Sequence, residues 1–565
     1  MKMVDSMGLR NLQPRHSLLM LLVLFSLNMP PALGEEPPPS PIRVAKRAST
    51  TVPLDSWVYP AFDRLAALGY LRSAFMGLRP WTRSECQRLL TETMQNISLD
   101  SGAPEEAATL YSALSAELLE DPAAAKLYKV ESLYFRWLDI AGQPLRDGYH
   151  LAETITNDYG RPFAQGSNLI VGASVSGTSG VFAWSARGEW QRWPSSTPLT
   201  PAVRQALAFA DNRPVLPDSG GGAQRFRLLD TTISMQLGRV QVSFGKQSLW
   251  SGPGQAGPWL FSNNAEPVWM AQMNGSSPMR IPAVARVLGP MRWQFFLGRL
   301  AGHQFVFSEP TMYGPAIRSQ PFMHGEKVSF HPTENLELGF GLTTVFGGPG
   351  LPFTAGNFAQ TFNFWDTVTT SQDRGDHRAG FDFSYRVPWL RRWLTLYADT
   401  LVEDEVSPLG SSRPAVRVGL YLPRIPRLSK TDLRMEGIYS DVPGQRAAAT
   451  VYYNHRYRSG YTNYGQLLGS WIGRQGRGGQ AWLGYWLRPQ SRIQLSYRHM
   501  EVDRSLLQGG RLSDIGLQSE FRLHRYMTVS SLLQYERWNF PLLSLRPENN
   551  VSIGFGINLL PNAGR

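Results

Sequence analysis

The sequence predicts an all-β transmembrane barrel of roughly 16 to 18 antiparallel strands, preceded by a small α-helical unit. Three observations predict this class. An export signal opens the chain, apolar and polar residues alternate from about residue 130 onward, and only one cysteine, Cys86, is present. An exported chain of 565 residues that cannot form an internal disulfide must be held together by backbone pairing and burial.

Residues 1–34 have the features of a cleaved secretory signal peptide. Lys2 and Arg15 precede an apolar run at residues 18–27, and residues 32–34 (ALG) suit cleavage because they are small at the positions that matter. A membrane anchor is the alternative, but the run is too short to cross roughly 30 Å of hydrocarbon. We therefore expect export, followed by a proline-rich linker at residues 35–52.

Helices are predicted within residues 53–125. Thr82 and Glu85 have the spacing of a capping box, in which the threonine side chain accepts a hydrogen bond from the glutamate amide. Apolar residues recur at helical spacing before and after this motif, at Val58, Phe62 and Leu65 and at Leu110, Leu114 and Leu118. A unit this small is marginal alone, so we expect it to dock onto the rest of the chain.

Residues 130–560 alternate with a period of two. The pattern is clear in the segments VSIGFGINL (551–559), LELGFGLTTVF (336–346) and FAWSARGEWQ (182–191). A soluble sandwich would bury the apolar face, whereas a membrane barrel would turn it toward lipid. The barrel is favoured because charged residues recur on the polar face throughout and aromatic residues cluster near strand ends.

The net charge of +12 does not indicate a nucleic-acid-binding protein. The arginines are scattered singly among aromatic residues, as in GRGGQAWLGYW, and form no dense basic run. Anionic lipid headgroups and acidic polysaccharides are better partners for an exported surface of this kind. We expect a monomer in outer-membrane lipid, without a nucleic-acid partner.

Residues 252–257 (GPGQAG) match the GxGxxG pattern of dinucleotide-binding loops. A strand is predicted before the motif at residues 240–245, but no helix pattern follows, and the expected acidic residue about 20 positions later is missing. A phosphate-binding role is therefore disfavoured, because the helix N-terminus that would hold the phosphate is not predicted.

No catalytic constellation stands out. The nine histidines form no metal-binding motif, so we expect neither a cofactor nor a metal. An acidic cluster, Asp399, Glu403, Asp404 and Glu405, could hold calcium or act as a glycosidase pair, but a solvated loop end is favoured. The sequence thus predicts a protein that is not an enzyme.

Aromatic and polar residues crowd the segment after residue 250. Aromatic faces stack on sugars, and amide, carboxylate and guanidinium groups bind sugar hydroxyls and carboxylates. The alternative is an interfacial aromatic belt with ordinary turns. The candidate polysaccharide-binding residues are Trp250, Trp259, Asn263, Asn264, Glu266 and Arg161. Arg187 and Glu189 are instead expected to pair with neighbours across the lumen.

The chain resembles the capsule assembly Wzi family. The resemblance covers about residues 53–560 and rests on an ordered set of segments: VPLDSWVYPAFDRLAALGYL, GLRPWTRSEC, NDYGRPFAQGSN, RGEWQRWP, SFGKQSLWSGPG, FSNNAEP, HGEKVSFHPTENLELGFG and FDFSYRVPWLRRWLTLYADTLVEDEVSP. It implies a barrel of about 18 strands with an N-terminal helical plug, and a lectin-like role in attaching capsular or other surface polysaccharide. A porin or glycan-export channel is the alternative function, and a barrel hydrolase a further one.

Overall fold

The computed structural model describes residues 47–119, 128–217, 221–362, 375–390, 392–404, 408–409, 411, 414–442 and 451–561. The predicted signal peptide, most of the predicted linker, and Glu405 lie outside the described residues.

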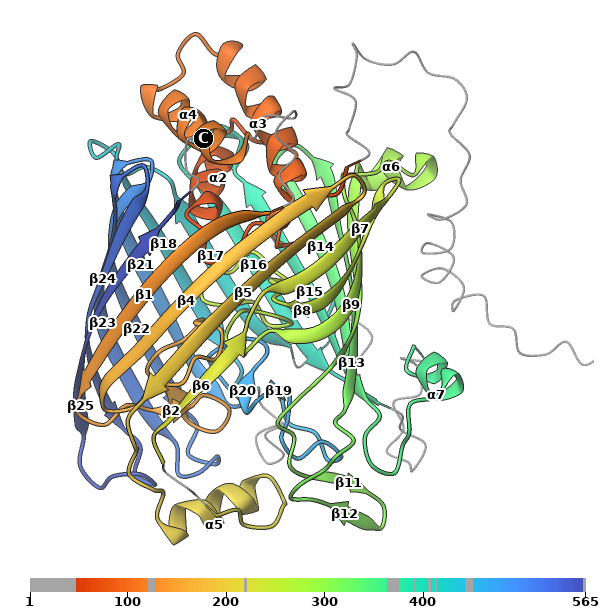
Figure 1. The fold of residues 1–565 in the computed structure, drawn as a ribbon, viewed down its shortest axis with the longest axis vertical. Coiled ribbons are helices and arrows are strands. Elements are labelled where there is room, and N and C mark those ends of the chain that lie inside the picture. The colour runs from red at the N-terminus through yellow and green to blue at the C-terminus, as the bar shows by residue number, and fades with distance from the viewer. Residues whose placement is uncertain are drawn as a thin grey trace, which may run out of the picture. The chain divides into compact units, whose positions relative to one another are not determined.

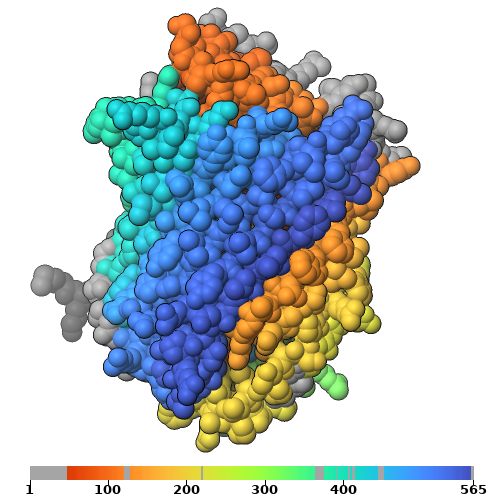
Figure 2. All heavy atoms as spheres, turned by 90° about the vertical axis from the view of Figure 1, so that its left-hand side faces the viewer, coloured from red at the N-terminus to blue at the C-terminus, as the bar shows by residue number. Residues whose placement is uncertain are grey.

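One closed antiparallel sheet forms a barrel (Figure 1). Strand β1 (Lys129–Ala141) pairs with β25 (Glu548–Leu559) on one side and with β4 (Gly166–Ser179) on the other, so the two ends of the sheet meet. Figure 2 shows this seam, with the orange strands against the dark blue ones. Strands β6 (Ala223–Leu228) and β7 (Thr231–Leu237) both pair with β5 and share one position, which gives an 18-strand barrel as the resemblance implied.

The other barrel strands follow in chain order around the wall. They are β5 (Phe182–Trp193), β8 (Val240–Gln247), β9 (Val268–Gly275), β10 (Met291–Arg299), β13 (Phe322–Thr333), β14 (Leu336–Phe346), β15 (Gly375–Arg386), β16 (Thr395–Glu403), β17 (Ala415–Leu422), β18 (Thr431–Tyr439), β21 (Gly476–Arg488), β22 (Ser491–Val502), β23 (Gly510–His524) and β24 (Met527–Asn539). Three short pairs lie in the connections: β2 (Arg146–Asp147) with β3 (Ala152–Glu153), β11 (Val306–Ser308) with β12 (Thr311–Tyr313), and β19 (Thr462–Asn463) with β20 (Gln466–Leu467).

Side chains alternate between an apolar exterior and a polar interior. Exposed apolar residues on the outer face include Leu133, Phe135, Val171, Phe226, Phe244, Val418, Leu517, Leu533, Ile553 and Phe555. Buried charged residues on the inner face include Glu189, Asp382, Asp399, Arg417, Glu436, Arg498, Asp514 and Glu536. This arrangement is that of a membrane barrel and not of a soluble sandwich, because the apolar face points away from the interior.

The helical segment before the barrel is confirmed. It contains α2 (Val58–Ala67), α3 (Arg83–Ser98) and α4 (Glu105–Leu118). The Thr82 side chain caps α3 by accepting a hydrogen bond from the Glu85 amide at 3.1 Å, as predicted. The Glu85 carboxylate does not complete a capping box among the described contacts, since it binds the Arg88 guanidinium at 2.8 and 2.9 Å instead.

Helix α2 docks onto the mouth of the barrel. Arg64 lies 3.6 Å from Asp432 of β18, and Arg386 of β15 donates hydrogen bonds of 2.8 Å to the carbonyls of Ala66 and Leu71. Trp486 of β21 packs into the apolar core of the helices. Short turns, such as the two-residue connection between β4 and β5, lie at this end (Figure 1). In outer-membrane barrels the short turns face the periplasm and the long loops face outward.

The lumen itself is filled by connections from the long-loop end. Residues 143–165, 248–267 and 451–475 fold inward and form one apolar cluster, whose larger members include Tyr149, Trp259, Phe261, Tyr452, Tyr461 and Trp471. Helices α5 (Pro201–Ala210) and α7 (Ala355–Gln360) also lie toward the long-loop end, whereas α6 (Pro282–Leu288) lies at the same end as α2–α4 (Figure 1). The 3-10 turn η1 (Pro388–Leu390) lies in the connection between β15 and β16. Within the described residues, no helix is both long and apolar enough to cross a membrane.

Candidate functional site

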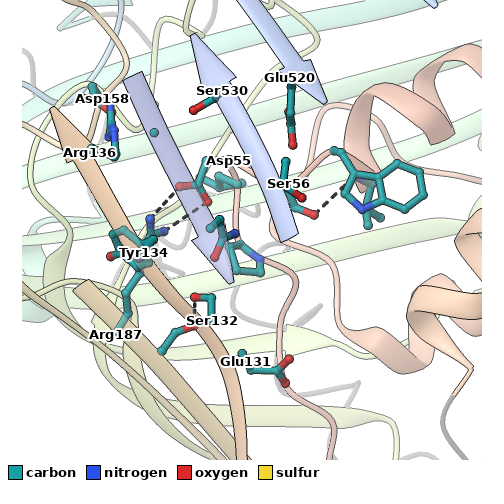
Figure 3. A pocket seen from close by; sticks show the side chains of 18 of the residues that line it. Asp55, Ser56, Glu131, Ser132, Tyr134, Arg136, Asp158, Arg187, Glu520 and Ser530 are labelled. Atoms are coloured by element: carbon teal, nitrogen blue, oxygen red, sulfur yellow. Dashed lines mark hydrogen bonds and ion pairs between the residues drawn. The ribbon is translucent and has the colours of Figure 1, made fainter. Parts of the chain in front are cut away.

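A cleft of about 700 Å³ lies between residues 50–57 and the inner wall of the barrel near the helices. The wall carries small residues at this level, including Ser132, Ser174, Ser530, Gly554 and Gly556, and their size leaves the space open. Figure 3 shows Asp55, Ser56, Glu131 and Glu520 around it. A cleft of this volume is within the size range of small-molecule sites.

Paired charges line the cleft. Arg187 of β5 donates two hydrogen bonds to the carboxylate of Asp55, at 2.8 and 3.1 Å, and so ties the N-terminal segment to the wall (Figure 3). Arg136 of β1 makes the same two-point contact with Asp158 at 2.9 and 3.1 Å. Two parallel hydrogen bonds fix the relative orientation of both partners.

Glu189 is the most enclosed carboxylate beside this cleft. It is fully buried and accepts hydrogen bonds from Arg161, from the Tyr134 hydroxyl at 2.6 Å and from the Gln191 amide at 2.9 Å. Arg187 lies 3.8 Å away. Arg187 and Glu189 are therefore paired as expected, but their partners belong to inserted segments and to the nearby strand β1, not to the opposite wall.

The GPGQAG loop binds carboxylates of the wall. The amides of Gln255 and Ala256 donate to the two oxygens of Glu436 at 2.6 and 3.1 Å, and the Trp259 amide donates to Asp399 at 2.9 Å. No helix follows the loop, as predicted. Gly257 has a φ of 96°, and a Cβ there would lie 2.7 Å from Asn157 Oδ1, so the position requires glycine.

The predicted sugar-contacting residues lie in the interior of the barrel. Trp259 is 1% exposed, Asn263, Asn264, Glu266 and Arg161 are also buried, and Trp250 is half-buried. The physical reason is that this loop carries apolar residues that join the luminal cluster and amides that satisfy wall carboxylates. Their direct contact with polysaccharide stays a prediction.

The prediction for the acidic cluster after residue 398 also needs correction. Asp399 and Glu403 are buried, because both side chains point into the lumen and meet arginines: Arg417 lies 3.4 Å from Asp399 and Arg378 lies 3.0 Å from Glu403. Asp404 alone of the described members is exposed. The solvated loop end was the wrong interpretation for the first two, since they neutralise buried cations.

Glu266 brings together three cations that the sequence did not single out as a site. Lys246 of β8 pairs with one carboxylate oxygen, and Arg225 and Arg227 of β6 each lie 3.7 Å from the other. The sequence feature that could have indicated this cluster is the segment RFRL (225–228). Its alternation puts both arginines on the polar face of a short strand.

His150 joins the inserted loop 143–165 to the end of helix α5. Its two ring nitrogens lie 2.8 Å from Asp147 and 2.9 Å from Asp211, and Arg474 also contacts Asp211 at 2.9 Å. Burial alone would lower the pKa of His150, but the two carboxylates outweigh it and raise the pKa to about 9. The charged imidazolium therefore persists at neutral pH and holds the two carboxylates together.

Comparisons with known proteins agree with this architecture. The model of the capsule assembly protein Wzi family matches residues 139–552. A curated relative, the uncharacterized 55.8 kDa protein in the cps region of Klebsiella pneumoniae, is 27% identical over 172 residues, which cover 30% of this chain and 32% of the relative. The match thus spans about a third of that relative's length.

One solved structure shows the same fold, and others are more distant. Escherichia coli Wzi, an outer-membrane protein involved in group 1 capsule assembly and a carbohydrate-binding β-barrel, has a TM-score of 0.65 at 16% identity, covering 91% of this chain and 99% of its own. OpdL of Pseudomonas aeruginosa has a TM-score of 0.41 at 8% identity, covering 77% and 98%. At 16% identity the likeness to Escherichia coli Wzi concerns the fold alone. The family model spans most of the barrel, and the chain belongs to the capsule assembly protein Wzi family.

Proposed function

We propose that this protein binds surface polysaccharide and holds it at the outer face of the outer membrane, as a monomer and without catalysing a reaction. Family membership supports a role in capsule assembly. Escherichia coli Wzi, which shares the fold, is a carbohydrate-binding barrel. The apolar exterior of the barrel suits insertion into lipid.

The observation that carries the proposal is the packing of the lumen. The hydroxyl of Tyr452 donates to the Trp259 carbonyl at 2.8 Å, and that of Tyr461 donates to the Leu260 carbonyl at 2.7 Å. The two tyrosine rings stack with centroids 5.7 Å apart. A polymer cannot pass through such a cross-section, so we assign polysaccharide contact to the long-loop end of the barrel.

The alternative, a porin or export channel, requires a continuous aqueous path. The inserted loops are held by buried hydrogen bonds to the wall, and opening a path would break many of them together. Each such break leaves a buried polar group unsatisfied, which costs about 1–3 kcal/mol. The packed lumen therefore favours a binding protein over a channel.

Retention of polysaccharide by cells tests the proposal. In a strain that lacks the gene, we expect polysaccharide to appear in the culture medium while the total amount made stays constant, and a plasmid copy to return it to the cells. The total amount is the control, because it separates attachment from synthesis. Equal retention with and without the protein would contradict the proposal.

A further inference from the structure

A cluster of cations and aromatic rings lies on the inner wall toward the long-loop end. Arg225 stacks over Trp193 at 5.3 Å, and Arg227 stacks over Tyr464 at 4.7 Å, measured from the guanidinium carbon to the ring centroid. The two arginines are adjacent on the same face of β6, and Tyr464 belongs to the connection between β19 and β20 (Figure 1). We call these four residues the arginine–aromatic cluster.

The cluster carries surplus positive charge. Arg225, Arg227 and the nearby Lys246 share one carboxylate, that of Glu266. Lys246 makes a hydrogen bond to it, whereas both arginines stay 3.7 Å away, beyond hydrogen-bond distance. Three cationic groups therefore face one anion that is already engaged, and an additional anion would be attracted here.

Donor groups of the arginines remain for a ligand. Among the described residues, the only side-chain hydrogen bond of the two arginines runs from Arg225 Nε to Gln191 at 3.1 Å. The Nε of Arg227 is buried and faces Glu266, so the donors for a ligand are the terminal guanidinium nitrogens. Stacking on a ring holds a guanidinium flat and leaves its edge for two parallel hydrogen bonds to a carboxylate. The side chains are also reachable, at 26% and 28% exposed for Arg225 and Arg227.

One residue of the cluster, Tyr464, also has a strained backbone. Tyr464 has a φ of 51° and is followed by Gly465 with a φ of 81°, the pattern of a tight two-residue hairpin turn. Asparagine or glycine normally takes the first of these positions, because a bulky side chain is disfavoured at positive φ. Tyr464 is nevertheless 38% exposed, so core packing does not explain it. Strain of this kind is frequent at ligand sites.

We propose that the arginine–aromatic cluster binds the carboxylate of an acidic sugar, a uronic acid, with Arg225 and Arg227 as the anion-binding groups and Trp193 and Tyr464 as surfaces for the sugar ring. The proposal rests on the proposed function, since it names the class of sugar that the protein recognises. Aromatic rings beside the charges favour a charged sugar over a bare inorganic anion.

Direct binding tests the site. Purified full-length protein in detergent is titrated with polygalacturonate and with its methyl ester, which has the same backbone without the charge. We expect the wild-type protein to bind the acid at least tenfold more tightly than the ester. Arg225→Gln with Arg227→Gln should abolish this preference, and Tyr464→Asn, which suits the positive φ, should weaken binding of both polymers severalfold.

Arg477→Gln is the matched control, because it removes one arginine that is exposed and paired with Glu501 away from the cluster. It should bind both polymers as the wild type does. Inorganic phosphate should compete no better than chloride at equal ionic strength, and selective displacement by phosphate would overturn the assignment to a sugar carboxylate.

The two proposals fail in different ways. If the double arginine variant is folded, as judged by heat modifiability on a gel, and keeps the wild-type preference, the cluster is not the site, although polysaccharide binding stands. If the wild-type protein binds neither these polymers nor the polysaccharide that cells retain, the proposed function itself fails.

Discussion

Variants of the buried pair Arg161 and Glu189 test whether these residues stabilise the fold or contact the ligand. Glu189→Ala removes the carboxylate that accepts from Arg161 at 2.9 Å and from Tyr134 at 2.6 Å, and leaves a guanidinium that is only 2% exposed with Asp158 as its remaining charged partner. Loss of one member of a buried pair costs about 3–5 kcal/mol in the free energy of unfolding. Arg161→Ala should cost a similar amount.

The double variant tests whether the two side chains act as a unit. With both groups removed, no unpaired charge of this pair remains buried, so the total cost should fall short of the sum of the single costs by about 2 kcal/mol. Urea unfolding followed by tryptophan fluorescence measures all three values. Arg477→Ala is the control, because its partner Glu501 is 40% exposed and such a surface pair contributes about 0–1 kcal/mol.

Two results would refute this reasoning. Additive costs, or single costs below about 1 kcal/mol, would mean that the pair is not a buried unit. A loss of polysaccharide retention per folded molecule in Arg161→Ala would mean that Arg161 contacts the ligand, as the sequence predicts, and does not merely support the fold.

Three further predictions concern stability and conductance. The pKa of His150 is raised to about 9, above its unfolded value of 6.5, so the stability that it contributes is complete below pH 6.5 and is lost as the pH rises through 9. The free energy of unfolding should fall by about 3 kcal/mol over this window. His150→Gln should remove this pH-dependent decline. Thr82→Ala should lower the free energy of unfolding of the helical segment by about 1 kcal/mol, and Leu89→Ala, at a fully buried position, by about 2–5 kcal/mol. Both variants should make the helices more sensitive to proteolysis while the barrel keeps its heat modifiability. Loss of heat modifiability in either variant would show that the helices and the barrel fold together. In planar bilayers the intact protein should give negligible current, and large stable currents would favour a channel.

The barrel could be predicted because the alternation of apolar and polar residues is visible within each strand. In residues 551–559 every second residue is apolar, and strands such as β25 keep that alternation through the whole wall. The helix cap at Thr82 could also be predicted, because it depends on two residues only three positions apart in the sequence. Local patterns of this kind survive folding because the neighbours that decide them are close in sequence.

The site was harder to predict because it depends on contacts between distant segments. Trp259 looks like a sugar platform in isolation, yet its amide binds Asp399 and its ring enters the luminal cluster. Arg227 and Tyr464 are far apart in sequence and meet because the connection that carries Tyr464 folds back inside the barrel. The direction in which a long connection folds is set by partners on the wall, and a single sequence does not reveal those partners.

Direct binding of polysaccharide by the isolated protein tests the central claim most simply. Purified full-length protein is applied to an array of bacterial surface polysaccharides, neutral and acidic, with heat-denatured protein as the control. We expect saturable binding to at least one acidic polysaccharide without any change in its chain length after prolonged incubation. Absence of binding to every polysaccharide, or shortening of the bound polymer, would contradict a non-catalytic protein that holds polysaccharide at the cell surface.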